Sequence, residues 1–220
     1  MGKVRSFGIE DGERIGPYRV LENVGRGWEG EVYKVVEVPT DAVRALKLFR
    51  TDELDSIRHL IHTAWYYEQL RWTQHVPIYH HYGQWFLDDD NGCWFLVFEF
   101  IDGVPLSALK RPTAKDFLKL ARAVATVHGA GYGVGDFSSL TNAFVRKSNG
   151  AIVFVDCDPG EPDAPNADFR EDCLVELPDA ANAMFGEALP KKVARLLAGL
   201  KAHKRFNETT LAEELSRLAV

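Results

Sequence analysis

The amino-acid sequence predicts an α+β protein with a β-rich front half and a mainly helical back half that meet near residue 102. The first hundred residues contain β-branched and aromatic runs with turn residues between them. Later residues repeat their apolar positions at helical spacing. Because 46% of the 220 residues are hydrophobic, the chain is expected to fold around a core.

Composition and charge weigh against several classes of protein. The net charge of −6 and the pI near 5.7 argue against nucleic-acid binding, which usually needs a basic surface. Three separated cysteines with no CxxC pair predict a reducing, cytoplasmic setting without disulfides. No transmembrane segment is expected, because the longest apolar run, 93–101, is too short. Residues 1–6 match the short pattern for N-myristoylation.

The sequence divides into a lead-in and two larger parts. Residues 1–15 are polar and contain glycine, so they are expected to form a loose N-terminal lead-in. Residues 16–101 contain most of the predicted strands, and 102–220 contain most of the predicted helices.

Periodicity and turn residues predict the individual elements. A helix is expected at 52–74, where Ile57 and Ile61 recur at helical spacing, and a second at 113–128. Two short strands and further helices follow the second helix. The strands expected in the front half are 18–24, 31–38, 42–49, 81–87 and 93–100.

The stretch VGRGWEGEVYKVVEV contains the pattern G-x-G-x-x-G at Gly25, Gly27 and Gly30. In a Rossmann fold the third glycine opens a helix that holds a pyrophosphate. Here Gly30 precedes β-branched residues suited to a strand, so the glycines are expected to close a hairpin over a nucleotide. A P-loop is also disfavoured, because the chain has no GxxxxGK[ST] run.

Lys47 lies on the next predicted strand, in the run Val43-Arg44-Ala45-Leu46-Lys47, 17 residues after Gly30. Strand alternation puts Val43, Ala45 and Lys47 on one face of the sheet. A lysine that faces inward needs an anionic partner, because burying it unpaired is costly.

These motifs, in this order, resemble the signature of the protein-kinase-like superfamily. Gly25–Val32 is similar to its G-x-G-x-x-G-x-V loop, and Val43–Lys47 is similar to V-A-I-K. Trp94–Gly103 resembles the last strand and hinge of its first lobe, and 204–215 resembles its last subdomain. The resemblance covers about residues 17–218. It implies a bilobal fold with an antiparallel β-sheet N-lobe and a mainly helical, shortened C-lobe.

The resemblance also implies a nucleotide site in the first part of the chain. Lys47 would reach the α- and β-phosphates of ATP, and Ala45 would contact the adenine ring. Glu68, about two residues late against the family register, is the glutamate expected to pair with Lys47. The other residues that the resemblance places at the nucleotide are Gly25, Gly27, Gly30, Val32, the gatekeeper Phe98, and the backbones of Glu99 and Ile101.

The stretch HGAGYGVGDFSSLTNAFV, 128–145, resembles the kinase run around H-R-D-L-K-x-x-N. Asp136 takes the place of the catalytic aspartate, which orients a hydroxyl or accepts its proton. Asn142 and Asp156 take the places of oxygen ligands for Mg²⁺ beside the phosphates. Asp158, which replaces the glycine of D-F-G, would add a metal ligand or take the role assigned to Asp156.

The sequence departs from the family pattern around Asp136. Val134 and Gly135 replace the family His and Arg, and this Gly-Asp pair resembles aminoglycoside-type phosphotransferases. Ser138 replaces the lysine that contacts the γ-phosphate. Asn142 follows the aspartate by six residues instead of five, which implies a one-residue bulge.

The resemblance predicts an ATP/Mg²⁺-dependent phosphotransferase that acts on protein Ser/Thr hydroxyls. Only sixteen residues separate Asp156 from Asp172, with no A-P-E motif, so a phosphorylation switch in an activation loop is not expected. Three alternatives stay open: a pseudokinase that binds nucleotide as a regulatory module, a kinase for a small-molecule substrate, and nucleotidyl transfer on a kinase fold.

Overall fold

The computed structural model describes residues 6–50, 57–86, 92–157, 169–203 and 209–218. The chain forms two compact units. Unit 1 comprises Met1–Gln69 and Pro77–Ile101, and unit 2 comprises Leu70–Val76 and Asp102–Val220. The crossing after Ile101 falls where the sequence changes from strands to helices.

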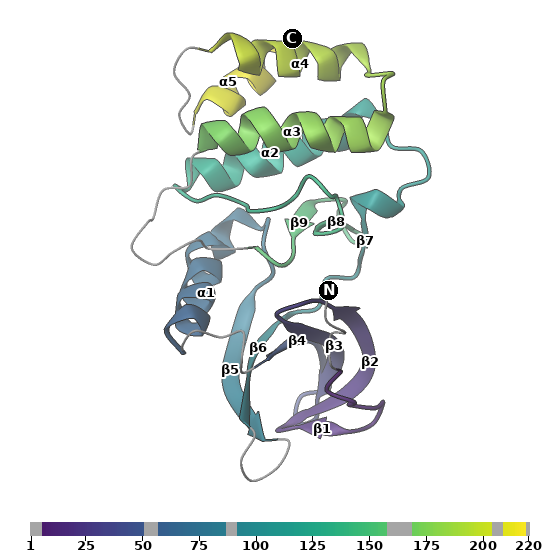
Figure 1. The fold of residues 1–220 in the computed structure, drawn as a ribbon, viewed down its shortest axis with the longest axis vertical. Coiled ribbons are helices and arrows are strands. Elements are labelled where there is room, and N and C mark those ends of the chain that lie inside the picture. Colours follow the sequence, from purple (N-terminus) through teal and green to yellow (C-terminus); the bar gives the residue numbers. More distant parts are fainter. Residues whose placement is uncertain (1–5, 51–56, 87–91, 158–168, 204–208, 219–220) are drawn as a thin grey trace. The chain divides into compact units, whose positions relative to one another are not determined.

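Unit 1 is an antiparallel sheet of six strands with one helix (Figure 1). The strand order is β1-β2-β3-β4-β6-β5, so β6 lies between β4 and β5. The elements are β1 (Arg14–Ile15), β2 (Tyr18–Arg26), β3 (Gly30–Glu37), β4 (Ala42–Phe49), α1 (Ile57–Leu70), β5 (Tyr79–Phe86) and β6 (Gly92–Glu99).

One face of this sheet carries the core of unit 1. The register places Tyr33, Leu46 and Val97 opposite one another on β3, β4 and β6, and all three are almost fully buried. Directly opposed residues in a sheet share a face, so these side chains pack into one layer. The cluster is completed by Ile15, Tyr18, Val20, Val35, Leu48, Cys93 and Phe95.

The expectation of a loose lead-in is wrong for its described residues. Phe7 and Ile9 pack against the core cluster, and Ile15 is fully buried in β1. These apolar side chains cover the open side of the sheet, which removes their surface from water. Residues 6–15 therefore belong to the folded part of unit 1.

Helix α1 buries Tyr66 and Tyr67 and leaves Trp65 exposed. The Tyr67 ring lies 4.7 Å from the Phe98 ring of β6, and both residues are buried. Ile57 and Ile61, whose spacing predicted the helix, lie on its exposed side at 42% and 47% exposure. The buried face carries Leu60 and Leu70 together with Tyr66 and Tyr67.

Unit 2 combines helices with a small antiparallel sheet of order β7-β8-β9 (Figure 1). Helix α2 begins with a capping box, in which the Thr113 hydroxyl accepts from Asp116 N and the Asp116 carboxylate accepts from Thr113 N. The elements are β7 (Gly103–Pro105), α2 (Ala114–Gly129), β8 (Ala143–Arg146), β9 (Ile152–Phe154), α3 (Phe169–Phe185), α4 (Lys191–Ala202) and α5 (Thr210–Arg217).

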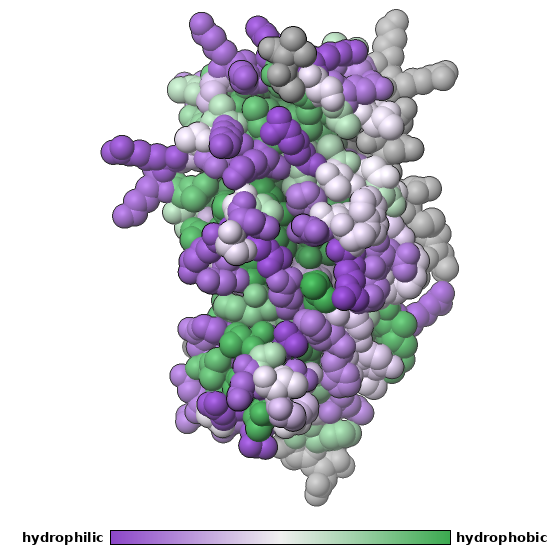
Figure 2. Space-filling model, turned by 180° about the vertical axis from the view of Figure 1, so that it is seen from behind, coloured by the Kyte–Doolittle hydropathy of each residue, from purple (hydrophilic) through white to green (hydrophobic). Residues whose placement is uncertain are grey.

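Hydrophilic residues dominate the face of the molecule shown in Figure 2, with small apolar patches between them. Scattered apolar side chains of this kind are normal on a protein surface. Among the described residues, no helix combines the length and apolar character that a membrane span requires.

His128, at the end of α2, makes the stability of unit 2 depend on pH. The residue is fully buried, its Nδ1 lies 3.5 Å from Cys173 Sγ of α3, and burial lowers its pKa from 6.5 to about 4. As pH falls below 6.5, His128 is protonated in the unfolded chain but stays neutral in the folded chain. The free energy of unfolding therefore decreases with falling pH until about pH 4. The full stabilisation is present only above pH 6.5, the pKa of this histidine in the unfolded chain.

We expect the free energy of unfolding to fall by about 2 kcal/mol between pH 7 and pH 5 because of this one histidine. His128→Gln should remove most of that dependence, whereas His81→Gln, at an exposed site on β5, should keep it. Urea unfolding at the two pH values measures the difference. Equal losses in the wild type and in His128→Gln would contradict the assignment.

Candidate functional site

The three glycines lie in a strand–loop–strand hairpin, as the sequence predicts. Strand β2 ends at Arg26 and β3 begins at Gly30, so no helix opens after the third glycine. A Cβ on Gly30 would lie 2.0 Å from the carbonyl oxygen of Leu48, so only glycine lets the hairpin approach β4 this closely.

The register of the sheet gathers the predicted nucleotide residues of unit 1 on one face. Val32 of β3 lies opposite Lys47 of β4, and Ala45 lies opposite Phe98 of β6. The four side chains therefore share the face opposite the core. The N–H of Glu99 donates to the Ile78 carbonyl at 2.8 Å.

Lys47 pairs with a carboxylate from the glycine hairpin itself. Its Nζ lies 2.5 Å from Glu29 Oε2, and the two side chains are 16% and 33% exposed. Glu29 thus meets the predicted need for an anionic partner, and the expected pairing of Lys47 with Glu68 stays a prediction. Glu68 is exposed on α1, where its charge adds to the effect of burial in raising the pKa of Tyr79.

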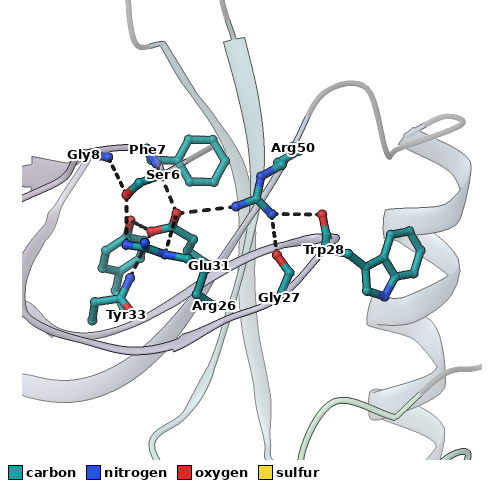
Figure 3. Close-up of polar contacts among 10 residues, drawn as sticks. Ser6, Phe7, Gly8, Arg26, Gly27, Trp28, Glu31, Tyr33 and Arg50 are labelled. Carbon is teal, nitrogen blue, oxygen red and sulfur yellow. Dashed lines mark hydrogen bonds and ion pairs between the residues drawn. The ribbon is translucent and has the colours of Figure 1, made fainter. Parts of the chain in front are cut away.

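A buried carboxylate that sequence reasoning missed lies at the base of the hairpin (Figure 3). Glu31 is fully buried and accepts hydrogen bonds from Tyr33 Oη at 2.6 Å and Asn23 Nδ2 at 3.0 Å. Arg26 and Arg50 supply the compensating positive charge. Strand alternation was the available signal, because it places Glu31 on the same face of β3 as the inward-facing Tyr33 and Val35.

In unit 2, Asp136 and Asn142 are brought together despite their six-residue spacing. Asn142 Nδ2 donates to the Asp136 carbonyl at 3.4 Å, and Ser138 Oγ donates to Asp136 Oδ1 at 3.2 Å. Between them, Leu140 has φ 63° and a buried side chain. The loop therefore contains a left-handed residue that is anchored by hydrophobic packing.

Asp156 lies two residues after the end of β9, and the preceding residue contacts Asn142 through the backbone. Val155 N donates to the Asn142 carbonyl at 2.8 Å, which brings Asp156 next to Asn142 in the chain fold. Asp156 is exposed and has φ 65°, a region that costs most residues energy. Aspartate is one of the few residues besides glycine that adopt this region readily. Asp158 lies outside the described residues.

Glu176 of α3 supports the segment that carries Asp136. Its Oε2 accepts hydrogen bonds from Phe137 N at 2.8 Å and Ser138 N at 3.0 Å. Sequence reasoning missed this contact, because the residues lie 38 and 39 positions apart. Gly135, which precedes Asp136 in the chain, has φ 79°. An arginine, which the family pattern has at this position, would be strained there.

The donor set of unit 2 fits a magnesium ion better than a protein-only metal cage. Across the described ranges, no group of three or more His, Cys, Asp or Glu side chains comes together. Asn142 and Asp156 offer hard oxygen donors at neighbouring positions. Mg²⁺ commonly uses one or two such protein ligands, with waters and phosphate oxygens completing its shell.

Comparison with known proteins gives related sequences and a set of similar structures. No protein-family model matches the chain. The chain is 35% identical over 122 residues to the serine/threonine-protein kinase PknD of Mycobacterium tuberculosis. That match covers 53% of this chain and 17% of PknD, so the chain spans a small part of the relative's length.

The structural comparison identifies the fold. The chain is similar to a crystal structure of the Mycobacterium tuberculosis PknI kinase domain, with a TM-score of 0.64 and 17% identity. The alignment covers 96% of this chain and 100% of that domain, and a second PknI kinase-domain structure matches with the same TM-score. The expected α+β, protein-kinase-like fold is therefore confirmed.

The contact of Glu176 predicts a measurable loss of stability. Glu176→Ala leaves two backbone N–H groups without their acceptor, which should cost about 2–3 kcal/mol of unfolding free energy. Glu176→Gln keeps an acceptor oxygen and should cost less, and Asp179→Ala on the exposed side of α3 should cost little. Urea denaturation compares the three variants. If alanine and glutamine at 176 cost the same, the bonds do not carry the stability.

Proposed function

We propose that this chain is an ATP/Mg²⁺-dependent phosphotransferase that acts on protein Ser/Thr hydroxyls and lacks an activation-loop switch. The observation that carries the proposal is the linked geometry of Asp136, Asn142 and Asp156. One hydrogen bond joins the first two, and a second, from Val155 N to the Asn142 carbonyl, places the third beside Asn142. The protein-kinase-like fold and the similarity to PknD support the same reaction class.

In the proposed reaction, Asp136 accepts the proton of the attacking hydroxyl. The hydroxyl oxygen bonds to the γ-phosphorus while the bond from that phosphorus to the bridging oxygen breaks, giving a phosphate ester and ADP. Asn142 and Asp156 would hold Mg²⁺, which supplies charge neutralisation at the phosphates. Lys47 would bind the α- and β-phosphates.

The absence of a switch follows from the residues before and after the proposed base. Gly135 replaces the arginine that would bind a phosphorylated loop, and its φ of 79° disfavours an arginine at this place. The short distance in sequence from Asp156 to Asp172 leaves little chain for an activation segment. The proposed enzyme is therefore competent without phosphorylation of such a loop.

A second candidate is a regulatory module that binds nucleotide without transferring phosphate. The ion pair between Lys47 and Glu29 favours it, because the lysine is already neutralised by the hairpin. Ser138, which stands at the position of the family lysine, bonds to Asp136 instead of offering a cation to a γ-phosphate.

Isotopic labelling separates the candidates. With ATP labelled at the γ-phosphate, the wild type should label a protein substrate, and Asp136→Ala should lose at least about 100-fold in rate. Asp179→Ala, which removes an exposed carboxylate of α3, serves as the control and should keep the rate. Transfer of an α-label would indicate nucleotidylation, and labelling of aminoglycosides alone would indicate a small-molecule kinase. Magnesium-dependent ATP binding without any transfer would support the regulatory module.

The ion pair of Lys47 predicts opposite effects of two substitutions on ATP affinity. Glu29→Gln removes the carboxylate that competes with phosphate and should tighten ATP binding about 5-fold. Lys47→Ala removes the cation and should weaken binding by more than this. Glu22→Gln breaks the Lys34–Glu22 pair of the same hairpin and should leave affinity unchanged. Calorimetric titration provides the dissociation constants, and wild-type affinity in Lys47→Ala would refute the assigned phosphate contact.

A further inference from the structure

The side chain of Arg50 joins the glycine hairpin to the buried carboxylate Glu31. One arm of its guanidinium, Nη2, lies 3.5 Å from Glu31 Oε1. The other arm, Nη1, donates to the carbonyls of Gly27 at 2.6 Å and Trp28 at 2.9 Å. Figure 3 shows the guanidinium between these two groups, with the Trp28 ring directed away from them. The side chain is 12% exposed, so these bonds compete little with water.

The main chain of Arg50 adds a third contact to the same loop. Arg50 N donates to the Glu29 carbonyl at 2.8 Å. The carbonyls of Gly27, Trp28 and Glu29 are thus all bound by one residue, which fixes the rotation of three consecutive peptide groups. A planar guanidinium can serve two acceptors on one side and a carboxylate on the other, whereas an ammonium cannot hold that geometry.

The direction of these carbonyls determines where the loop N–H groups point. In a trans peptide the C=O of one residue and the N–H of the next point in opposite directions. With the Gly27 and Trp28 carbonyls turned to Arg50, the N–H groups of Trp28 and Glu29 point away from it. Within the part of the chain that the structure describes, neither N–H has a hydrogen-bond acceptor. Successive free N–H groups of this kind form an anion-binding surface.

The N-terminal segment holds Glu31 and Arg50 from the other side. Phe7 N donates to Glu31 Oε1 at 3.1 Å, and the Phe7 ring lies 5.5 Å from the Arg50 guanidinium carbon. Ser6 Oγ accepts a hydrogen bond from Arg26 Nη2 at 2.9 Å. The segment therefore contacts both arginines that neutralise the buried carboxylate.

We propose that Arg50 is a positioning residue that presets the glycine hairpin for a nucleotide phosphate, and that Glu31 and the N-terminal segment at Phe7 hold Arg50 in place. The inference rests on the proposed function for the identity of the ligand. We call Arg50, Glu31 and the N-terminal segment at Phe7 the clamp. The clamp acts in the protein without nucleotide, because its contacts are all formed there. The N-terminal segment thereby contributes to nucleotide binding through its contacts with Glu31 and Arg50.

The test compares Arg50→Met with a matched control in the same pair of strands. Arg44→Met breaks the Arg44–Glu37 pair, which also joins β3 to β4 but does not contact the hairpin. Two amide protons report on the clamp without nucleotide: that of Gly27, bonded to the Gly30 carbonyl, and that of residue 50, bonded to the Glu29 carbonyl. Their exchange is followed by NMR, and the dissociation constant for ADP with Mg²⁺ by calorimetry.

Arg50→Met should speed exchange of both amides at least about 10-fold and weaken ADP binding about 10-fold. Arg44→Met should change neither, and Arg50→Lys should recover only a minor part of the loss. Wild-type exchange and affinity in Arg50→Met, or full recovery in Arg50→Lys, would overturn the clamp. Faster exchange in Arg50→Met together with a wild type that binds no nucleotide would support the clamp and overturn the proposed function.

A second pair of variants tests the N-terminal segment and serves if Arg50→Met does not fold. Phe7→Pro removes the N–H that donates to Glu31, whereas Phe7→Leu keeps it. Both lose the aromatic ring over Arg50, so their difference isolates the hydrogen bond. Phe7→Pro should speed exchange of the Gly27 amide several-fold over Phe7→Leu. Equal exchange in the two variants would show that the segment does not hold the clamp.

Discussion

The carboxylate of Glu31 is the constraint on which the first unit depends. A fully buried carboxylate costs several kcal/mol unless charge and hydrogen bonds compensate it. The compensating groups come from separate segments: a backbone N–H at Phe7, Arg26 at the end of β2, Tyr33 on β3, and Arg50 after β4. Each segment that is displaced would remove one of the groups that compensate this buried charge. The hairpin, the strand that carries Lys47 and the N-terminal segment are therefore stabilised together.

The two units use different means to position polar side chains. In unit 1 the ladder between strands sets the direction of each side chain, so Lys47 and Ala45 face the same side without special backbone geometry. In unit 2 the polar residues lie on loops that adopt uncommon conformations at Leu140 and Asp156. Such conformations persist only where surrounding contacts hold the loop. Glu176 supplies two contacts to the loop before Leu140, by accepting hydrogen bonds from Phe137 N and Ser138 N.

The sequence by itself determined the features that depend on neighbouring residues. The β-branched run after Gly30 distinguished a hairpin from a Rossmann turn, because strand and helix formers differ locally. Alternation placed Ala45 and Lys47 on one face, and the spacing of Asp136 and Asn142 predicted a bulge between them. Helix α2 followed from its apolar periodicity.

Only the tertiary structure decided which distant residues meet. It paired Lys47 with Glu29 across the hairpin, buried Glu31 under two arginines, and carried Glu176 to a loop 38 residues away. It also showed that the polar-looking lead-in covers the core through Phe7. Periodicity encodes which face of an element is apolar, because that depends on spacing along the chain. Charge pairing depends on distances in space, which the packing of the sheet and helices sets.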